Sequence, residues 1–159
     1  MLPYTEGTLF FVPLRNGGYA RGVVARASPE GKVLLGYFFG PQLPTTEISD
    51  LGNLAPSKAI LRLRFGDLGL INGEWPIEGR VPEWNRSEWP MPAFVRKDPL
   101  GKKKPIIVHY SDIDPSRVES EHPTNDDCEL APDSMSGYGS VEIKLTKLLA
   151  SENSGNHLQ

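Results

Sequence analysis

The residues of this 159-residue chain best suited to catalysis or metal binding are its three histidines and its single cysteine. The histidines are His109, His122 and His157. They lie apart in the sequence, and none stands with carboxylates at a spacing typical of a metal site or a catalytic triad. Cys128 lies between Asp127 and Glu129, whose charges disfavour the thiolate that a cysteine nucleophile needs. The sequence therefore predicts no catalytic site, no metal site and no cofactor.

Acidic residues are the most concentrated chemical feature of the chain. Residues 1–104 contain 14 Lys and Arg and 10 Asp and Glu, a net charge of +4, whereas residues 105–159 contain 3 and 10, a net charge of −7. Within residues 105–133, eight acids face a single basic residue, Arg117. The eight are Asp112, Asp114, Glu119, Glu121, Asp126, Asp127, Glu129 and Asp133. Such a run is typical of a solvated loop or of a surface that attracts a basic partner, and both interpretations stay open.

Net charge and hydropathy argue against two classes of partner. The formal net charge is −3, and the one basic run, Lys102–Lys104, is a short turn-like tip that we interpret as solvated, so we expect no nucleic-acid partner. No run approaches the roughly 18 apolar residues of a membrane span, and residues 1–7 lack the parts of a signal peptide. We expect no membrane partner and a cytoplasmic location, where a lone cysteine forms no intramolecular disulfide.

Glycine and proline indicate the fold class. The 16 glycines and 15 prolines place many turns between short elements, which favours a mainly β protein. The length fits one β-rich domain, residues 1–150, followed by a polar C-terminal tail, residues 151–159.

Runs of β-favouring residues, two of which alternate between apolar and polar, and the turn residues between them predict about six strands. They are expected at residues 7–14, 19–27, 32–39, 59–65, 75–80 and 105–110. The first three are predicted to form a meander. Residues 138–150 predict a short C-terminal helix, with a strand running into a helical turn as the alternative. The expected fold is a strongly bent antiparallel sheet or a small barrel with this helix and long loops.

The same patterns predict where particular residues lie. The arginines expected on the outer or polar faces of their strands are Arg21, Arg26, Arg62 and Arg64. Gly22 is expected to mark a close approach or a bulge. Residues 40–56 are expected to be a connection with at most one helical turn. Residues 111–139 are expected to be a long mobile loop, because they combine acids with few large apolar residues.

All three tryptophans lie in residues 73–94, together with four prolines that exclude a helix or a long central strand. We expect an irregular wrap held by its aromatic side chains. The predicted structural cluster consists of Trp75, Trp84, Trp89 and Phe94. An exposed aromatic binding ledge is the alternative, which we favour less because large apolar side chains are mostly buried.

Five stretches of the chain carry motifs that can be compared with known families. They are Gly7–Leu14, Asn16–Val24, Asn72–Pro82, Trp89–Phe94 and Tyr138–Leu145. Taken together they resemble the immunity protein 26 family of bacterial polymorphic toxin systems, over most of residues 7–149. The resemblance implies a mainly β, non-enzymatic inhibitor in a bacterial cytosol, which neutralises a toxin encoded beside it. The acidic stretch is not part of these motifs.

The resemblance implies a cognate toxin as the partner. We hypothesise that this toxin is a nuclease and that the eight acids from Asp112 to Asp133 bind its basic substrate groove. An acidic solubilising loop is the alternative for these residues. Two other functions stay open: an endoribonuclease on an SH3-like barrel, which the net charge of −3 and the missing acid-base set disfavour, and a β adaptor domain that binds peptides through a Pro/Trp surface.

Overall fold

The protein is mainly β, as predicted. The computed structural model describes residues 1–47, 54–125 and 129–157, with side chains in the last segment described as far as residue 152. Its strands are β1 (Thr8–Pro13), β2 (Tyr19–Ala27), β3 (Val33–Leu43), β4 (Leu61–Gly66), β5 (Ile77–Arg80), β6 (Phe94–Arg96), β7 (Ile106–Ser111), β8 (Asp114–Pro123) and β9 (Met135–Ser136). Its helices are α1 (Leu68–Ile71), α2 (Tyr138–His157) and the short 3-10 helices η1 (Pro56–Lys58) and η2 (Arg86–Glu88).

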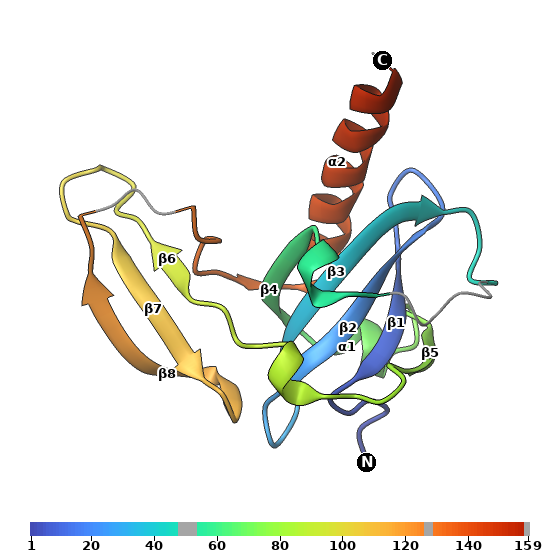
Figure 1. Ribbon diagram of the computed structural model, residues 1–159, viewed down its shortest axis with the longest axis horizontal. Coiled ribbons are helices and arrows are strands. Elements are labelled where there is room, and N and C mark those ends of the chain that lie inside the picture. The colour runs from blue at the N-terminus through green and yellow to red at the C-terminus, as the bar shows by residue number, and fades with distance from the viewer. Residues whose placement is uncertain (48–53, 126–128, 158–159) are drawn as a thin grey trace.

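The described residues form a six-stranded sheet and a three-stranded sheet (Figure 1). The six-stranded sheet has the order β5-β1-β2-β3-β4-β9 and does not close into a barrel. Its pairs are antiparallel except for β4 with β9. The three-stranded sheet has the antiparallel order β6-β7-β8, and β8 lies against β2 and β3 of the larger sheet. The second half of the chain therefore adds a separate small sheet to one side of the first.

Strands β1, β2 and β3 form the predicted meander. The turn between β1 and β2 contains Gly17 and Gly18 with φ of +101° and +69°, values that side-chain-bearing residues rarely adopt. Gly22 lies opposite Phe10, and a Cβ at Gly22 would lie 2.4 Å from the Phe10 ring. The predicted close approach is confirmed, because only a glycine leaves room for this ring.

Both faces of the six-stranded sheet are buried. Val141, Leu145 and Leu149 of α2 pack onto one face. The core on that face includes Phe10, Val24, Phe38, Phe65 and Trp75. The other face is covered by the Trp-containing wrap and the three-stranded sheet. Its core includes Val23, Leu35, Tyr37, Phe39, Trp89, Phe94, Val108 and Tyr110. Cover on both faces explains why β3 is apolar along most of its length.

The C-terminal helix is longer than predicted. Helix α2 begins at Tyr138, which confirms the helix over the alternative strand, and it continues through the predicted polar tail to His157. Figure 1 shows its C-terminal end projecting away from both sheets. The apolar residues that anchor it all come before residue 150, which is why the pattern indicated only the first part.

The prediction of one long mobile loop over residues 111–139 is wrong. Residues 114–123 form β8, paired with β7, and residues 135–136 form β9, paired with β4. Strand β8 is at the edge of its sheet, and its residues from Ser116 onward are exposed. An edge strand with both faces in water does not show apolar alternation, so its polar sequence did not indicate a strand.

Two arginines predicted on outer or polar strand faces are buried. Arg26 is 3% exposed and Arg64 is 8% exposed. Both lie on the face of the six-stranded sheet that the three-stranded sheet covers, and this cover comes from residues far along the chain. The helical turn predicted within residues 40–56 falls on residues 46–51, of which residues 48–51 lie outside the described residues.

The burial of the tryptophans yields a stability prediction. We expect Trp75→Ala and Trp89→Ala each to lower the free energy of unfolding by about 3 to 5 kcal/mol, because each indole is almost fully buried among aromatic rings. Trp84→Ala is the control and should lower it clearly less, since Trp84 is only partly buried. Equilibrium urea denaturation measures all three, and an unchanged midpoint for Trp89→Ala would contradict a structural role.

Candidate functional site

The six described acids of the eight predicted to bind a partner do not form one surface patch. Asp112 and Asp133 pair with arginines of the protein itself. Asp114 is partly buried, and Glu119, Glu121 and Glu129 are exposed. Asp126 and Asp127 lie outside the described residues. The acidic residues therefore need to be considered group by group.

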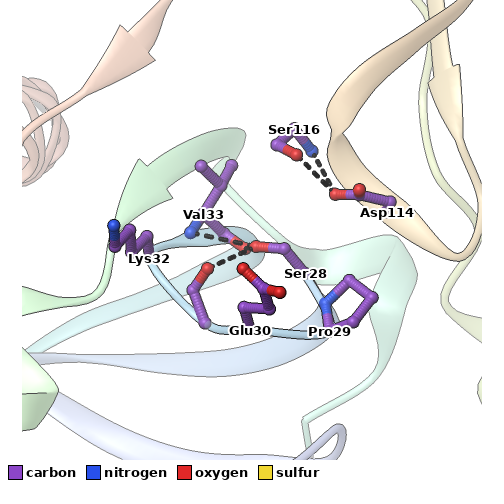
Figure 2. Close-up of a pocket in the computed structure, with 8 residues that line it drawn as sticks. Ser28, Pro29, Glu30, Lys32, Val33, Asp114 and Ser116 are labelled. Carbon is purple, nitrogen blue, oxygen red and sulfur yellow. Dashed lines mark hydrogen bonds between the residues drawn. The ribbon is translucent and has the colours of Figure 1, made fainter.

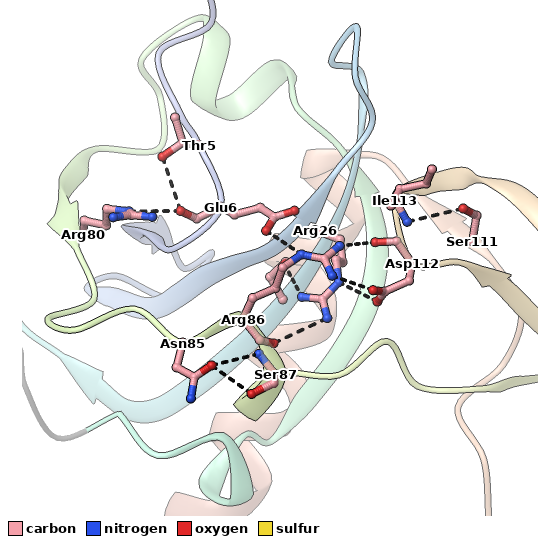
Figure 3. A network of polar contacts seen from close by, with 11 residues as sticks. Thr5, Glu6, Arg26, Arg80, Asn85, Arg86, Ser87, Ser111, Asp112 and Ile113 are labelled. Carbon is pink, nitrogen blue, oxygen red and sulfur yellow. Dashed lines mark hydrogen bonds and ion pairs between the residues drawn. The ribbon is translucent and has the colours of Figure 1, made fainter.

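Asp112 lies in the turn between β7 and β8 and binds two arginines (Figure 3). Its carboxylate accepts a hydrogen bond from Nε of Arg26 at 2.8 Å and another from Nη1 of Arg86. Nε of Arg86 also donates to Glu6 at 2.8 Å. The hydrogen bonds from Arg86 and Arg26 lower the pKa of Asp112 below its ordinary value. This network joins β2, η2 and the β7–β8 turn.

Asp133 forms a second internal network on the same side of the larger sheet. Its side chain is 6% exposed and accepts hydrogen bonds from Arg64 at 3.4 Å and from Arg96 at 2.9 Å. The Tyr110 hydroxyl also donates to it, and burial together with this bond raises the pKa of Tyr110 to about 12. The Arg64 guanidinium lies 3.7 Å from the centroid of the Tyr110 ring, a cation–π contact.

These two carboxylates hold the three-stranded sheet against the larger one. A buried guanidinium is strongly unfavourable unless an acid and hydrogen bonds compensate it, and Arg26 and Arg64 receive their acids from residues 112 and 133. Sequence reasoning missed the role of both arginines. The opposite net charges of the two parts of the chain were the one indication in the sequence that some acids form ion pairs with the protein's own arginines.

The remaining described acids differ from Asp112 and Asp133 in their contacts. Glu119 and Glu121 are exposed on β8, and Glu121 also forms an ion pair with Arg96 at 3.1 Å. Asp114 accepts a hydrogen bond from the backbone N–H of Ser116 at 3.0 Å, and its hydrogen bonds with Ser116 lower its pKa. Among the described members of the eight acids, Glu119, Glu121 and Glu129 therefore have exposed carboxylates that face solvent, with Glu121 shared with Arg96.

A cavity of about 430 Å³ lies between the β2–β3 turn and the start of β8 (Figure 2). It is lined by Ser28, Pro29, Glu30, Gly31, Lys32, Val33, Asp114 and Ser116. The Ser28 hydroxyl is engaged with the carbonyls of Gly31 and Val33 at 2.7 and 2.8 Å. A hydroxyl bound in this way is a turn-stabilising group, and no base within the cavity is hydrogen-bonded to it that would make it a nucleophile.

The four predicted aromatic residues lie on two faces of the six-stranded sheet. Trp75 packs with Phe10 beneath α2, and its Nε1 donates to Glu142 at 2.9 Å. Trp84 and Trp89 pack together on the opposite face, with ring centroids 5.4 Å apart, and Phe94 belongs to the same core. Trp75 and Trp89 are 1% and 2% exposed, so neither offers an aromatic ledge to a partner.

Two further cavities border the Trp-containing wrap on that face. Their volumes are about 490 and 270 Å³, and they are lined by consecutive parts of the segments 54–62 and 81–93, with Leu130 and its neighbours closing the second. Glu83, Glu88 and Lys58 border the first cavity, and Arg62 and Glu129 border the second. The charges are mixed in sign, so neither cavity favours a ligand of one charge.

His109 and His122 lie on neighbouring strands with stacked rings 5.3 Å apart. Among the described residues, no three His, Cys, Asp or Glu side chains are placed to hold a metal ion. None of the helices in the described part of the chain is both long and apolar enough to cross a membrane.

Comparison with known proteins decides the family. The sequence model of the family described as Immunity protein 26 matches residues 5–106. The chain belongs to the immunity protein 26 family. No curated protein and no solved structure matched the chain. The matched residues run from β1 through β6, so the internal networks that involve Asp112 and Asp133 connect the matched part to strands outside it.

The Asp133 network predicts a large effect of one neutral substitution. We expect Asp133→Asn to lower the free energy of unfolding by about 3 to 5 kcal/mol, because it leaves the buried Arg64 without its counter-charge. Glu119→Gln removes a charge from an exposed position nearby and should change it by less than about 0.5 kcal/mol. Urea denaturation at neutral pH measures both. Equal stability of the two variants would contradict the role of Asp133.

The Asp112 network predicts a pH dependence. A carboxylate with a lowered pKa stabilises the folded state above its ordinary value of 3.8, and this contribution is lost as the pH falls through the lowered pKa. We expect Asp112→Asn to be less stable than the wild type near neutral pH, with the difference shrinking as the pH falls below 3.8. Denaturation curves across this range test it, and a difference that is constant with pH would contradict the ion pairs.

Proposed function

We propose that this protein is an immunity protein that binds a cognate toxin and neutralises it without catalysis of its own. The observation that carries the proposal is the family match over residues 5–106, nearly two thirds of the chain. The proposed place of action is the bacterial cytosol. Inhibition by binding requires a stable surface, and the two carboxylate networks supply one by fixing the three-stranded sheet on the larger sheet.

The finer proposal concerns the chemistry of the toxin. A nuclease groove is basic because it holds phosphates, so exposed carboxylates on an inhibitor complement it. Glu119 and Glu121 on β8 and Glu129 are exposed, and Asp126 and Asp127 follow β8 in the sequence. We assign the toxin contact to these five acids and leave out Asp112, Asp114 and Asp133, whose carboxylates are hydrogen-bonded within the protein.

The experiment for the function is co-expression with the toxin domain encoded by the adjacent reading frame. We expect the protein to restore growth of cells that express this domain and to form a complex with it in size-exclusion chromatography. We also expect the purified protein alone to leave RNA intact. Failure to bind or protect would contradict the immunity function, and RNA cleavage that survives purification would support the endoribonuclease alternative.

A charge-neutralising variant tests the nuclease proposal. We expect Glu119→Gln/Glu121→Gln, and separately Asp126→Asn/Asp127→Asn/Glu129→Gln, to slow association with the toxin at low salt by about tenfold, with a smaller effect at high salt. Stopped-flow or biosensor kinetics measure the rates. The matched control is Glu47→Gln/Glu78→Gln, which removes two exposed charges elsewhere. Association rates unchanged in both acidic variants would contradict the contact.

A further inference from the structure

The loop between β6 and β7, residues 97–105, is the most basic segment of the protein, and we refer to it as the lysine loop. Lys97, Lys102, Lys103 and Lys104 are all exposed. The loop lies at the end of the three-stranded sheet that points away from the six-stranded sheet (Figure 1). It falls within the matched residues 5–106, unlike the acids of β8.

The lysine loop is internally ordered by one carboxylate. Asp98 accepts hydrogen bonds from the backbone N–H groups of Leu100, Lys102 and Lys103, each at 3.1 Å. The N–H of Gly101 donates to the Asp98 carbonyl at 3.0 Å, and Gly101 has a φ of +67°. The Asp98 carboxylate thus accepts hydrogen bonds from the loop's own backbone. The side chains of Leu100 and the lysines point outward.

Leu100 is the unusual residue of this loop. Its side chain is 75% exposed, the highest value among the described large apolar residues after the N-terminal Met1. Protein interfaces concentrate their binding energy in a few apolar anchors that are surrounded by polar or charged residues. An ordered tip with one exposed leucine beside three consecutive lysines has this arrangement, and an ordered tip loses little conformational entropy on binding.

We propose that the lysine loop is a docking element for the toxin, in which Leu100 enters an apolar pocket and Lys102, Lys103 and Lys104 pair with carboxylates around it. The inference rests on the proposed function and names the toxin surface: an apolar pocket in an acidic rim. A metal-dependent nuclease carries both signs of charge, since carboxylates hold its metal ions and basic residues hold its substrate. The lysine loop and the acids of β8 can therefore contact one such toxin together.

A protein partner fits this loop better than a nucleic acid does. The whole chain carries a net charge of −3, and Glu119 and Glu121 are exposed in the same small sheet, where they repel a phosphate backbone. Nucleic-acid readers also place several aromatic or basic side chains along a groove, whereas this loop is a single projecting tip.

The test uses the full chain and a catalytically inactive form of the toxin domain from the adjacent reading frame. We expect Leu100→Ala, and separately Lys102→Gln/Lys103→Gln/Lys104→Gln, to weaken binding at least about tenfold, mainly through faster dissociation for Leu100→Ala. The matched control Lys32→Gln/Lys58→Gln/Lys147→Gln removes three exposed lysines elsewhere and should change the affinity by less than about twofold. Thermal unfolding of each variant checks the fold.

A further variant distinguishes the effect of the lysine loop's order on binding from the effect of its positive charge. Asp98→Ala makes the loop more positive but removes the three hydrogen bonds that order it. We expect it to weaken binding, whereas attraction by charge alone would strengthen it, and that result would overturn the proposed docking geometry.

The outcomes distinguish this inference from the proposed function. If the wild type does not bind the toxin domain, the proposed function fails. If the wild type binds and the loop variants bind equally well, the lysine loop is not the docking element. Lysine-dependent binding of the wild type to single- or double-stranded oligonucleotides in fluorescence anisotropy would overturn the inference in favour of a nucleic-acid contact.

Discussion

Burial of the arginine side chains on β2 and β4 is the constraint on which the two-sheet arrangement depends. Arg26 and Arg64 lie under the three-stranded sheet, where an unpaired guanidinium would strongly destabilise the fold. Asp112 and Asp133 neutralise them from positions 86 and 69 residues away in the chain. The small sheet can therefore pack on the larger sheet only in an orientation that brings both carboxylates to these arginines. This orientation determines where β8 and the lysine loop lie relative to the larger sheet.

The features that could be predicted from sequence are those that local chemistry decides. The meander followed from three β-rich runs separated by turn residues. Gly17 has a φ that other residues rarely adopt, and Gly22 leaves room for the Phe10 ring. The features that could not be predicted depend on whether residues far away in the sequence cover a given strand in the fold. Arg64 alternates like a solvent-facing residue because nothing near it in sequence buries it, and β8 lacks an apolar face because it is an exposed edge.

In the candidate site, too, the sequence indicated the local features and not the contacts between distant residues. The acidic run was evident from composition, but its separation into structural and accessible acids required the positions of the arginines. The tryptophans were expected to form one cluster because they are close in sequence, yet Trp75 turns beneath α2 while Trp89 packs on the opposite face. For the immunity function, the consequence is a rigid small sheet with carboxylates along β8 and ordered lysines at its tip.

Hydrogen–deuterium exchange of the protein, alone and in complex with the inactive toxin domain, tests this account most directly. The measurement reports on the backbone amides of the whole chain at once and needs no substitution. The account predicts slower exchange in the complex at the lysine loop and along β8, with unchanged exchange in α2 on the far side of the larger sheet. Protection confined to α2, or no change anywhere in the chain, would contradict it.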